Sequence, residues 1–179
     1  MVDFEQSSGG VLVPARSKLI VGGKYLGQII RDGRVIDEWE DDNIVVNEGL
    51  NSLLNIMFFS GTQITAWYLG LFEGNYTPVS TVTAATITAA STETTAYASA
   101  TRPAYTAVAA ASQSETNAAA RASFIFNATK TIYGAFLVSN ATKSSTAGTL
   151  FSAAQFASSK NVVNLDELLL TYTFNASSV

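Results

Sequence analysis

Apolar and polar positions alternate with a period of two along much of the chain, which is the pattern of half-buried β-strands. The earliest clear example surrounds Arg31-Asp32-Gly33-Arg34, where residues 25–30 and 35–39 form apolar, β-prone runs. Asp-Gly between two such runs favours a tight hairpin, because both central positions of the turn require positive φ. We therefore predict a β-hairpin centred on residues 31–34.

Further segments with the same period follow. Residues 62–72 are largely apolar on both faces, which predicts a strand that is covered on both sides. Four more candidate strands, joined by polar links, are residues 122–127, 131–139, 149–156 and 168–174. Several short strands separated by turn-forming segments are typical of an antiparallel β-sandwich or barrel. The predicted fold class is therefore mainly β.

One segment has a helical period instead. Residues 47–57 place Leu50, Leu53, Leu54 and Met57 on one apolar face, which predicts a single short helix. Asn47 is a suitable residue to cap its first turn with a side-chain oxygen. We expect the apolar face to pack on an edge or an end of the sheet.

The N-terminal segment lacks a regular pattern. Gln6-Ser7-Ser8-Gly9-Gly10 is a flexible run, and Pro14 limits regular structure. We predict a flexible arm over residues 1–17, followed by a single β-rich domain over residues 18–179. Val11, Leu12 and Val13 are candidate partner-binding residues, because a short apolar run can add as a strand to a neighbouring protein. A disordered terminus is the alternative.

Residues 77–118 are dominated by Thr, Ala and Ser. The segment suits a long loop, a surface excursion or thin strands. A structureless loop of this length is unusual inside a compact domain, so we expect it to be functional or docked on a partner. Its few bulky residues, Tyr97, Arg102 and Tyr105, complete the set of predicted partner-binding residues.

Composition supports a role in contacts between proteins. Charged residues make up 13% of the 179 positions, against about 25% in ordinary globular domains. Ala, Ser and Thr replace them and give a neutral surface suited to another protein, although a secreted or repetitive protein would share this bias. The ten basic residues are scattered and the net charge is −4, which argues against nucleic acid as a partner. No run approaches the ~18–20 apolar residues of a membrane span, and a secretory signal pattern is absent.

The inventory of reactive side chains is small. The chain contains neither Cys nor His, which excludes disulfides and the Ser–His–Asp and Cys–His arrangements. The acidic run Glu38–Asp42 lacks calcium-loop spacing and is better explained as a solvated turn than as a cation site. Ser17-Lys18 and Ser159-Lys160 are formal Ser–Lys pairs, and Glu73 is one of several dispersed carboxylates. We predict no catalytic residue, no cofactor and no metal site, and hence no enzyme.

Several stretches together resemble a family of virion structural proteins that tailed bacteriophages encode beside the major capsid protein. The resemblance runs in order over most of the chain, from about residue 25 to residue 174. Its middle, residues 77–118, is richer in Ala and Thr than the family pattern. The stretches that carry the resemblance are residues 30–39 (IRDGRVIDEW), 43–51 (NIVVNEGLN), 61–71 (GTQITAWYLGL), 97–103 (YASATRP), 132–139 (IYGAFLVS) and 148–152 (GTLFS).

The resemblance implies a protein that is assembled in the host cytoplasm and located in the virion. The first hypothesis is a capsid decoration or cement protein, present in many copies or as a homo-oligomer, that binds the major capsid protein or other virion proteins. The second is a tail or head–tail connector protein, such as an adaptor, tube or fibre. A third, from another class, is a carbohydrate-binding module in which Trp39, Trp67, Tyr68 and Tyr97 stack on sugars.

Overall fold

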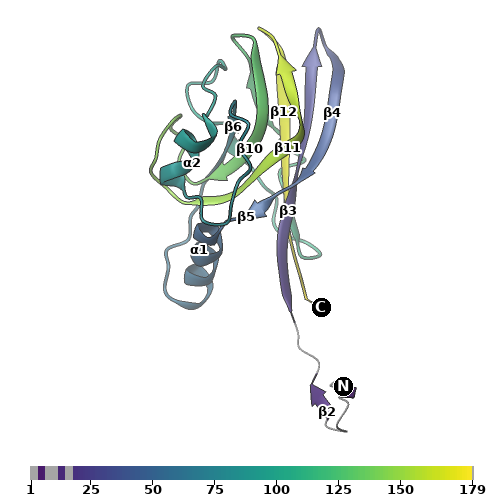
Figure 1. Cartoon of the computed structure of the whole chain (residues 1–179), viewed down its shortest axis with the longest axis vertical. Coiled ribbons are helices and arrows are strands. Elements are labelled where there is room, and N and C mark those ends of the chain that lie inside the picture. Colours follow the sequence, from purple (N-terminus) through teal and green to yellow (C-terminus); the bar gives the residue numbers. More distant parts are fainter. Residues whose placement is uncertain (1–3, 7–11, 15–17, 179) are drawn as a thin grey trace.

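The computed structural model describes residues 4–6, 12–14 and 18–178 of the chain, and it is mainly β (Figure 1). Two antiparallel sheets of five strands make up the body, which confirms the predicted fold class. Two short strands near the N-terminus, β1 (Phe4–Gln6) and β2 (Leu12–Pro14), pair with each other. The predicted arm over residues 1–17 lies largely outside the described residues. Val11 is not described, and only the backbone pairing of Leu12 and Val13 is.

The first sheet has the strand order β4-β3-β12-β8, with β9 also pairing with β12. Its strands are β3 (Leu19–Arg31), β4 (Arg34–Asp42), β8 (Ser114–Thr116), β9 (Ala122–Ile125) and β12 (Glu167–Ser178). Strands β3 and β4 form the predicted hairpin, and Asp32 and Gly33 both have positive φ, at 50° and 74°. The Asp-Gly signal therefore identified this turn correctly.

The second sheet has the order β5-β11-β10-β6-β7. Its strands are β5 (Ile44–Val45), β6 (Trp67–Phe72), β7 (Ala104–Tyr105), β10 (Lys130–Val138) and β11 (Leu150–Val162). Strand β6 is shorter than the predicted strand over residues 62–72, and β11 runs well beyond residue 156. The main core lies between the two sheets, where Tyr25, Phe124, Leu137, Phe156 and Tyr172 are all buried.

A second, smaller core covers the other face of the β6–β10–β11 sheet. Helix α2 (Ala84–Ser91) lies over this face (Figure 1), and its Ile87 packs in one cluster with Phe72 and Phe136. Periodicity predicts one helix, so α2 is an addition within residues 77–118. Its residues are Ala, Thr, Ile and Ser, which have no helical stripe to detect. A capping box between Thr83 and Thr86 defines its start.

Helix α1 (Asn47–Phe58) matches the predicted helix in position but not in packing. Asn47 does not cap it: Val46 is the N-cap, and the Asn47 backbone N–H donates to Ser80 instead. Gly49 is the sole buried residue of α1, because its backbone lies against Phe151 at a distance that leaves no room for a side chain. The apolar face therefore packs only in part: Leu50 and Leu53 are half-buried, whereas Leu54 and Met57 are exposed.

Glu48 fixes the start of α1 to its surroundings. Its carboxylate accepts hydrogen bonds from the backbone N–H groups of Ala84, at 2.8 Å, and Leu150, at 2.7 Å. Ala84 is the first residue of α2, where a negative charge is favourable because helix N-termini carry free N–H groups. One side chain thus joins the beginnings of α1, α2 and β11, while the rest of α1 extends away from the sheets (Figure 1).

The acidic run Glu38–Asp42 belongs to β4 and is not a turn, so that prediction is wrong. Its residues alternate across the strand, and Trp39 points inward to meet Phe156 at a ring distance of 5.2 Å. Asp37 pairs with Lys160 at 3.1 Å, and Asp41 accepts a hydrogen bond from the backbone of Ala157. These contacts join the outer edge of β4 to β11 and close one side of the sandwich.

Glycine and phenylalanine alternate across the β6–β10 pair. Gly134 is opposite Phe72, and Gly70 is opposite Phe136, so each ring covers the facing glycine. A methyl group at Gly134 would overlap both the Phe72 ring and the carbonyl oxygen of Ala154.

Gly134→Ala should therefore lower the free energy of unfolding by about 1–3 kcal/mol, because a packed core responds to added volume with strain. Urea denaturation of the purified variant measures this loss. Gly22→Ala is the matched control, since a side chain there meets open space. Equal stabilities for Gly134→Ala and Gly22→Ala would contradict the prediction.

Candidate assembly surface

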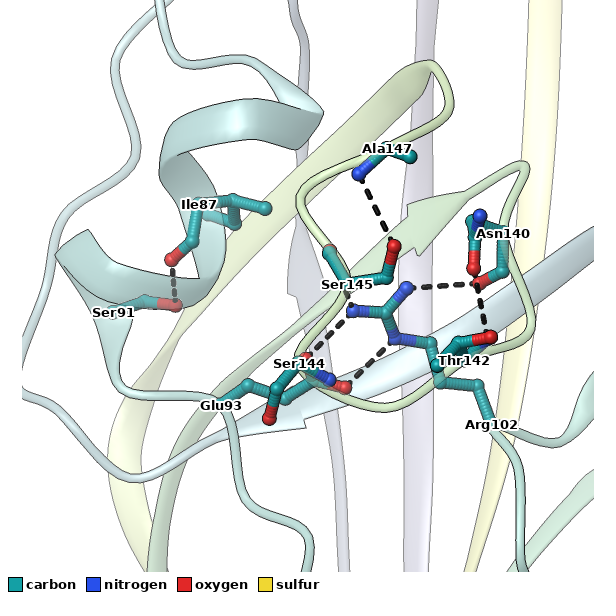
Figure 2. A network of polar contacts seen from close by, with 9 residues as sticks. All are labelled: Ile87, Ser91, Glu93, Arg102, Asn140, Thr142, Ser144, Ser145 and Ala147. Carbon is teal, nitrogen blue, oxygen red and sulfur yellow. Dashed lines mark hydrogen bonds and ion pairs between the residues drawn. The ribbon is translucent and has the colours of Figure 1, made fainter.

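A buried ion pair holds the loops above the second sheet together (Figure 2). Arg102 forms a two-pronged contact with Glu93, through Nε to Oε1 and Nη2 to Oε2, both at 2.7 Å. The two side chains are 0% and 1% exposed. Arg102 also donates to the backbone carbonyls of Asn140 and Ser145, and Ser144 donates its N–H to Glu93. The network joins residues 93–102 to the loop between β10 and β11.

Tyr97 lies beside this network. Its ring packs edge-on against Phe124, at 5.1 Å, and the Lys143 ammonium sits 3.6 Å from the ring centre. Lys143 also donates to the backbone carbonyls of Thr95 and Tyr97. Burial lowers the pKa of Lys143 and raises that of Tyr97, because both charged forms lose hydration there. The contacts of Tyr97 and Lys143 are thus internal to the fold.

The predicted partner-binding residues of the excursion therefore have different locations. Tyr97 is 2% exposed and Arg102 is 1% exposed, so neither offers a surface to a partner, and the prediction is wrong for both. Bulky residues in a small-residue segment can anchor that segment to its own domain as readily as to another protein. Tyr105 is different, because it is partly exposed and lines a cleft. Its partner-binding role stays a prediction.

That cleft lies at the open end of the sandwich and has a volume of about 690 Å³. It is bordered by α1 and the loop that follows it, by β7, and by the facing strands β8 and β12. The lining includes Ile56, Trp67, Tyr105, Phe151, Tyr172 and Phe174. It reaches the main core, because Leu137 and Tyr172 belong to that core and also line the cleft.

Aromatic rings meet edge-to-face along the cleft in two groups. Phe151 contacts Trp67 at a ring distance of 5.6 Å and Phe174 at 5.2 Å. Tyr105 meets Tyr172 at 5.8 Å. Burial raises the pKa of both tyrosines, that of Tyr172 to about 12, so both hydroxyls stay protonated at neutral pH. The Tyr105 hydroxyl is shielded from solvent and has no hydrogen-bond partner among the described residues.

The end of α1, next to the cleft, exposes large apolar side chains. Phe58 is 80% exposed, Phe59 76%, Met57 65% and Leu54 51%. Single exposed apolar residues are ordinary, but a contiguous group of this kind marks an interaction site. We call Leu54, Met57, Phe58 and Phe59 the α1 apolar end. Periodicity predicts the helix but not its exposure, since the same stripe would suit a buried helix.

Charge is distributed so that this side of the chain is nearly neutral. Between Glu48 and Glu115 the sequence contains three charged residues. Glu93 and Arg102 are paired and buried, and Glu73 contacts Lys130 at 3.0 Å. By contrast, the exposed face of β4 carries a row of acidic residues, namely Glu38, Glu40 and Asp42. The α1 apolar end therefore lies in a region with little net charge to keep it hydrated, and Glu115 places one carboxylate at the border of the cleft.

Two of the reactive groups considered from the sequence, Lys160 and Glu73, have structural partners. Lys160, of the Ser159–Lys160 pair, binds Asp37 and lies over the Trp39 ring at 4.5 Å. Glu73 is held by Lys130. Three or more residues with metal-binding side chains do not gather anywhere in the part of the chain that the structure describes. Of the aromatic residues considered for sugar stacking, Trp39 and Tyr97 pack internally and Trp67 lines the cleft.

Asp166 forms an ion pair with Arg31 that makes folding sensitive to acid. Arg31 donates to both of its carboxylate oxygens, at 2.8 and 2.6 Å, and the Val163 N–H donates at 2.8 Å. The Arg31 guanidinium is the main reason that the pKa of Asp166 is lowered in the fold. A lowered pKa adds stability above the unfolded-state pKa, near 3.9 for Asp, and that stability disappears as the pH falls through the folded-state value.

We therefore expect the free energy of unfolding to decrease as the pH falls below about 4. Asp166→Asn should be less stable than the parent near neutral pH, and the difference should shrink as the pH falls. Urea denaturation at several pH values measures both. A constant difference between the two proteins across this range would show that the Asp166 charge is not responsible.

No family model matches the chain, and no curated protein matches it. Neither helix among the described residues has the length and apolar character needed to cross a bilayer.

Proposed function

We propose that this chain is a structural component of a tailed-phage virion, in which it acts as a capsid decoration or cement protein. The observation that carries the proposal is the α1 apolar end, where Phe58 and Phe59 are 80% and 76% exposed beside an aromatic cleft. An apolar surface of this kind gains free energy when a partner protein removes it from water. In this role the chain binds neighbouring capsid subunits through α1 and works without a catalytic group, a cofactor or a metal.

Three features support the proposal beyond that surface. The ordered resemblance to virion proteins covers most of the chain. The side of the chain that contains α1 has little uncompensated charge, which suits a surface that is covered after assembly. The buried Arg102–Glu93 pair and Glu48 fix the loops and the base of α1, so the apolar end projects from a rigid support.

A tail or head–tail connector role is the alternative, and the same apolar end would serve it. The number of copies per particle separates the two roles. Quantitative mass spectrometry of purified particles should find hundreds of copies for a decoration protein. A count of about six or twelve copies would favour the tail, because a connector forms one closed ring at a single vertex. Absence of the chain from purified particles would reject both virion roles.

A further inference from the structure

The cleft beside β7 is an apolar site for which the proposed function names no occupant. Strand β7 is the outermost strand of its sheet, so one edge of Ala104–Tyr105 has no strand beside it. An extended peptide can add to such an edge through main-chain hydrogen bonds, with alternate side chains directed into pockets. The cleft supplies the pocket, because Trp67, Tyr105 and Phe174 line it.

We propose that this cleft binds residues Val11–Pro14 from a second copy of the chain, in extended conformation along the edge of β7. The exchange of arms then links copies of this chain to one another. The proposal concerns contacts between identical chains, so it does not depend on whether a capsid protein is the other partner.

The chemistry of the arm fits the cleft. Residues 6–15 carry no charge, and Val11-Leu12-Val13 is the apolar run within them. Alternation would direct Val11 and Val13 to one side and Leu12 to the other. Pro14 follows at the position where pairing would end, since proline has no N–H to donate.

Charge complementarity favours one direction of the docked arm along β7. Glu115, on β8, lines the cleft and has no ion-pair partner among the described residues. Arg16 and Lys18 come after the apolar run, two and four positions beyond Pro14. Of the two directions along β7, we place the docked Val11–Pro14 segment in the one that brings this basic stretch toward Glu115. The Tyr105 hydroxyl, which lacks a partner, would gain a backbone acceptor.

The path of the chain favours docking of the arm in the cleft of a second copy over docking in its own cleft. Strand β3 begins at Leu19, which pairs with Ser178 at the end of a two-stranded ribbon that projects below the sandwich in Figure 1. Phe174, in the cleft, pairs with Gly23 at the base of that ribbon. To reach its own cleft, the arm would have to reverse direction at the tip and run back about 13 Å along its own ribbon. The arm of a neighbouring copy needs no such reversal.

Sedimentation velocity of the full-length chain over a range of concentrations tests the proposal. The parent should associate, and Leu12→Asp should weaken association at least about hundredfold, because a charge cannot enter an apolar cleft without a large loss of hydration. Thr65→Arg, on the exposed border of the cleft, should do the same by steric and charge exclusion. Asp42→Lys, on the far face of β4, is the matched control and should associate like the parent.

A pair of charge-reversal variants distinguishes this contact from non-specific apolar association. Arg16→Glu and Glu115→Lys should each weaken association about tenfold, and the double variant should recover most of it. A parent chain that stays monomeric overturns the proposal, as does association that Leu12→Asp leaves unchanged. Trp67 fluorescence of the parent can also be compared with that of Leu12→Asp. A difference that does not vary with concentration would mean that the arm occupies the cleft of its own chain, and would also overturn the proposal.

Discussion

Replacing both Phe58 and Phe59 with glutamate is expected to abolish attachment of the chain to capsid shells while leaving its fold intact. Both rings are more than three-quarters exposed, so no core contact is lost in the free protein. If a partner buries both rings, their removal lowers the binding free energy by at least about 3 kcal/mol, which is more than a hundredfold in affinity. Buried carboxylates would weaken binding further.

Co-sedimentation with shells that lack this chain measures the effect. The matched control is Val35→Glu with Ile36→Glu, which removes two exposed apolar residues from the β3–β4 hairpin, where they are 54% and 49% exposed. This control should bind like the parent. Undiminished binding by the Phe58 and Phe59 variant, or equal losses for the two pairs, would show that α1 is not the attachment surface.

Arg102→Met is expected to be the most destabilising single change at a polar residue, at about 3–5 kcal/mol. The substitution leaves the Glu93 carboxylate, which is 1% exposed, without its counter-charge. It also removes the donors to the carbonyl oxygens of Asn140 and Ser145. Urea denaturation, followed by circular dichroism, measures the loss.

A second variant tests whether the unpaired charge is the cause. Arg102→Met combined with Glu93→Leu removes both charges together, and it should be more stable than Arg102→Met alone, since an apolar pair of similar volume tolerates burial. Arg34→Met, on the exposed turn of the hairpin, is the control and should change stability little. A double variant no more stable than Arg102→Met would assign the loss to the loop hydrogen bonds instead.

Local signals in the sequence were sufficient for the elements that depend on local physics. The Asp32–Gly33 turn, the position of α1 and the strands of the C-terminal third follow from turn chemistry and periodicity. Helix α2 did not follow, because its residues form no apolar stripe, the high helix propensity of Ala is offset by Thr and Ser, and its position depends on packing over Phe72 and Phe136. The acidic run in β4 was missed because Trp39, and not the charges around it, determines which face turns inward.

The candidate site was less accessible to sequence reasoning. A helical apolar stripe has the same pattern whether a core or a partner covers it. The exposure of Phe58 and Phe59 therefore follows from the fold and not from the sequence pattern. Arg102 stood out as the one basic residue in a long neutral segment, yet its role depends on Glu93, nine positions earlier, and on a loop that comes much later in the chain. One signal was available but unused: the near absence of charge between Glu48 and Glu115.

In the proposed role, assembly covers the neutral side of the chain, with the α1 apolar end and the cleft. Hydroxyl-radical footprinting of the free chain and of the chain on purified particles tests this coverage. We expect Met57, Phe58, Phe59 and Trp67 to lose reactivity on particles, while Val35 and Ile36 keep theirs. Unchanged reactivity of Phe58 and Phe59, with protection of the β3–β4 hairpin instead, would contradict it.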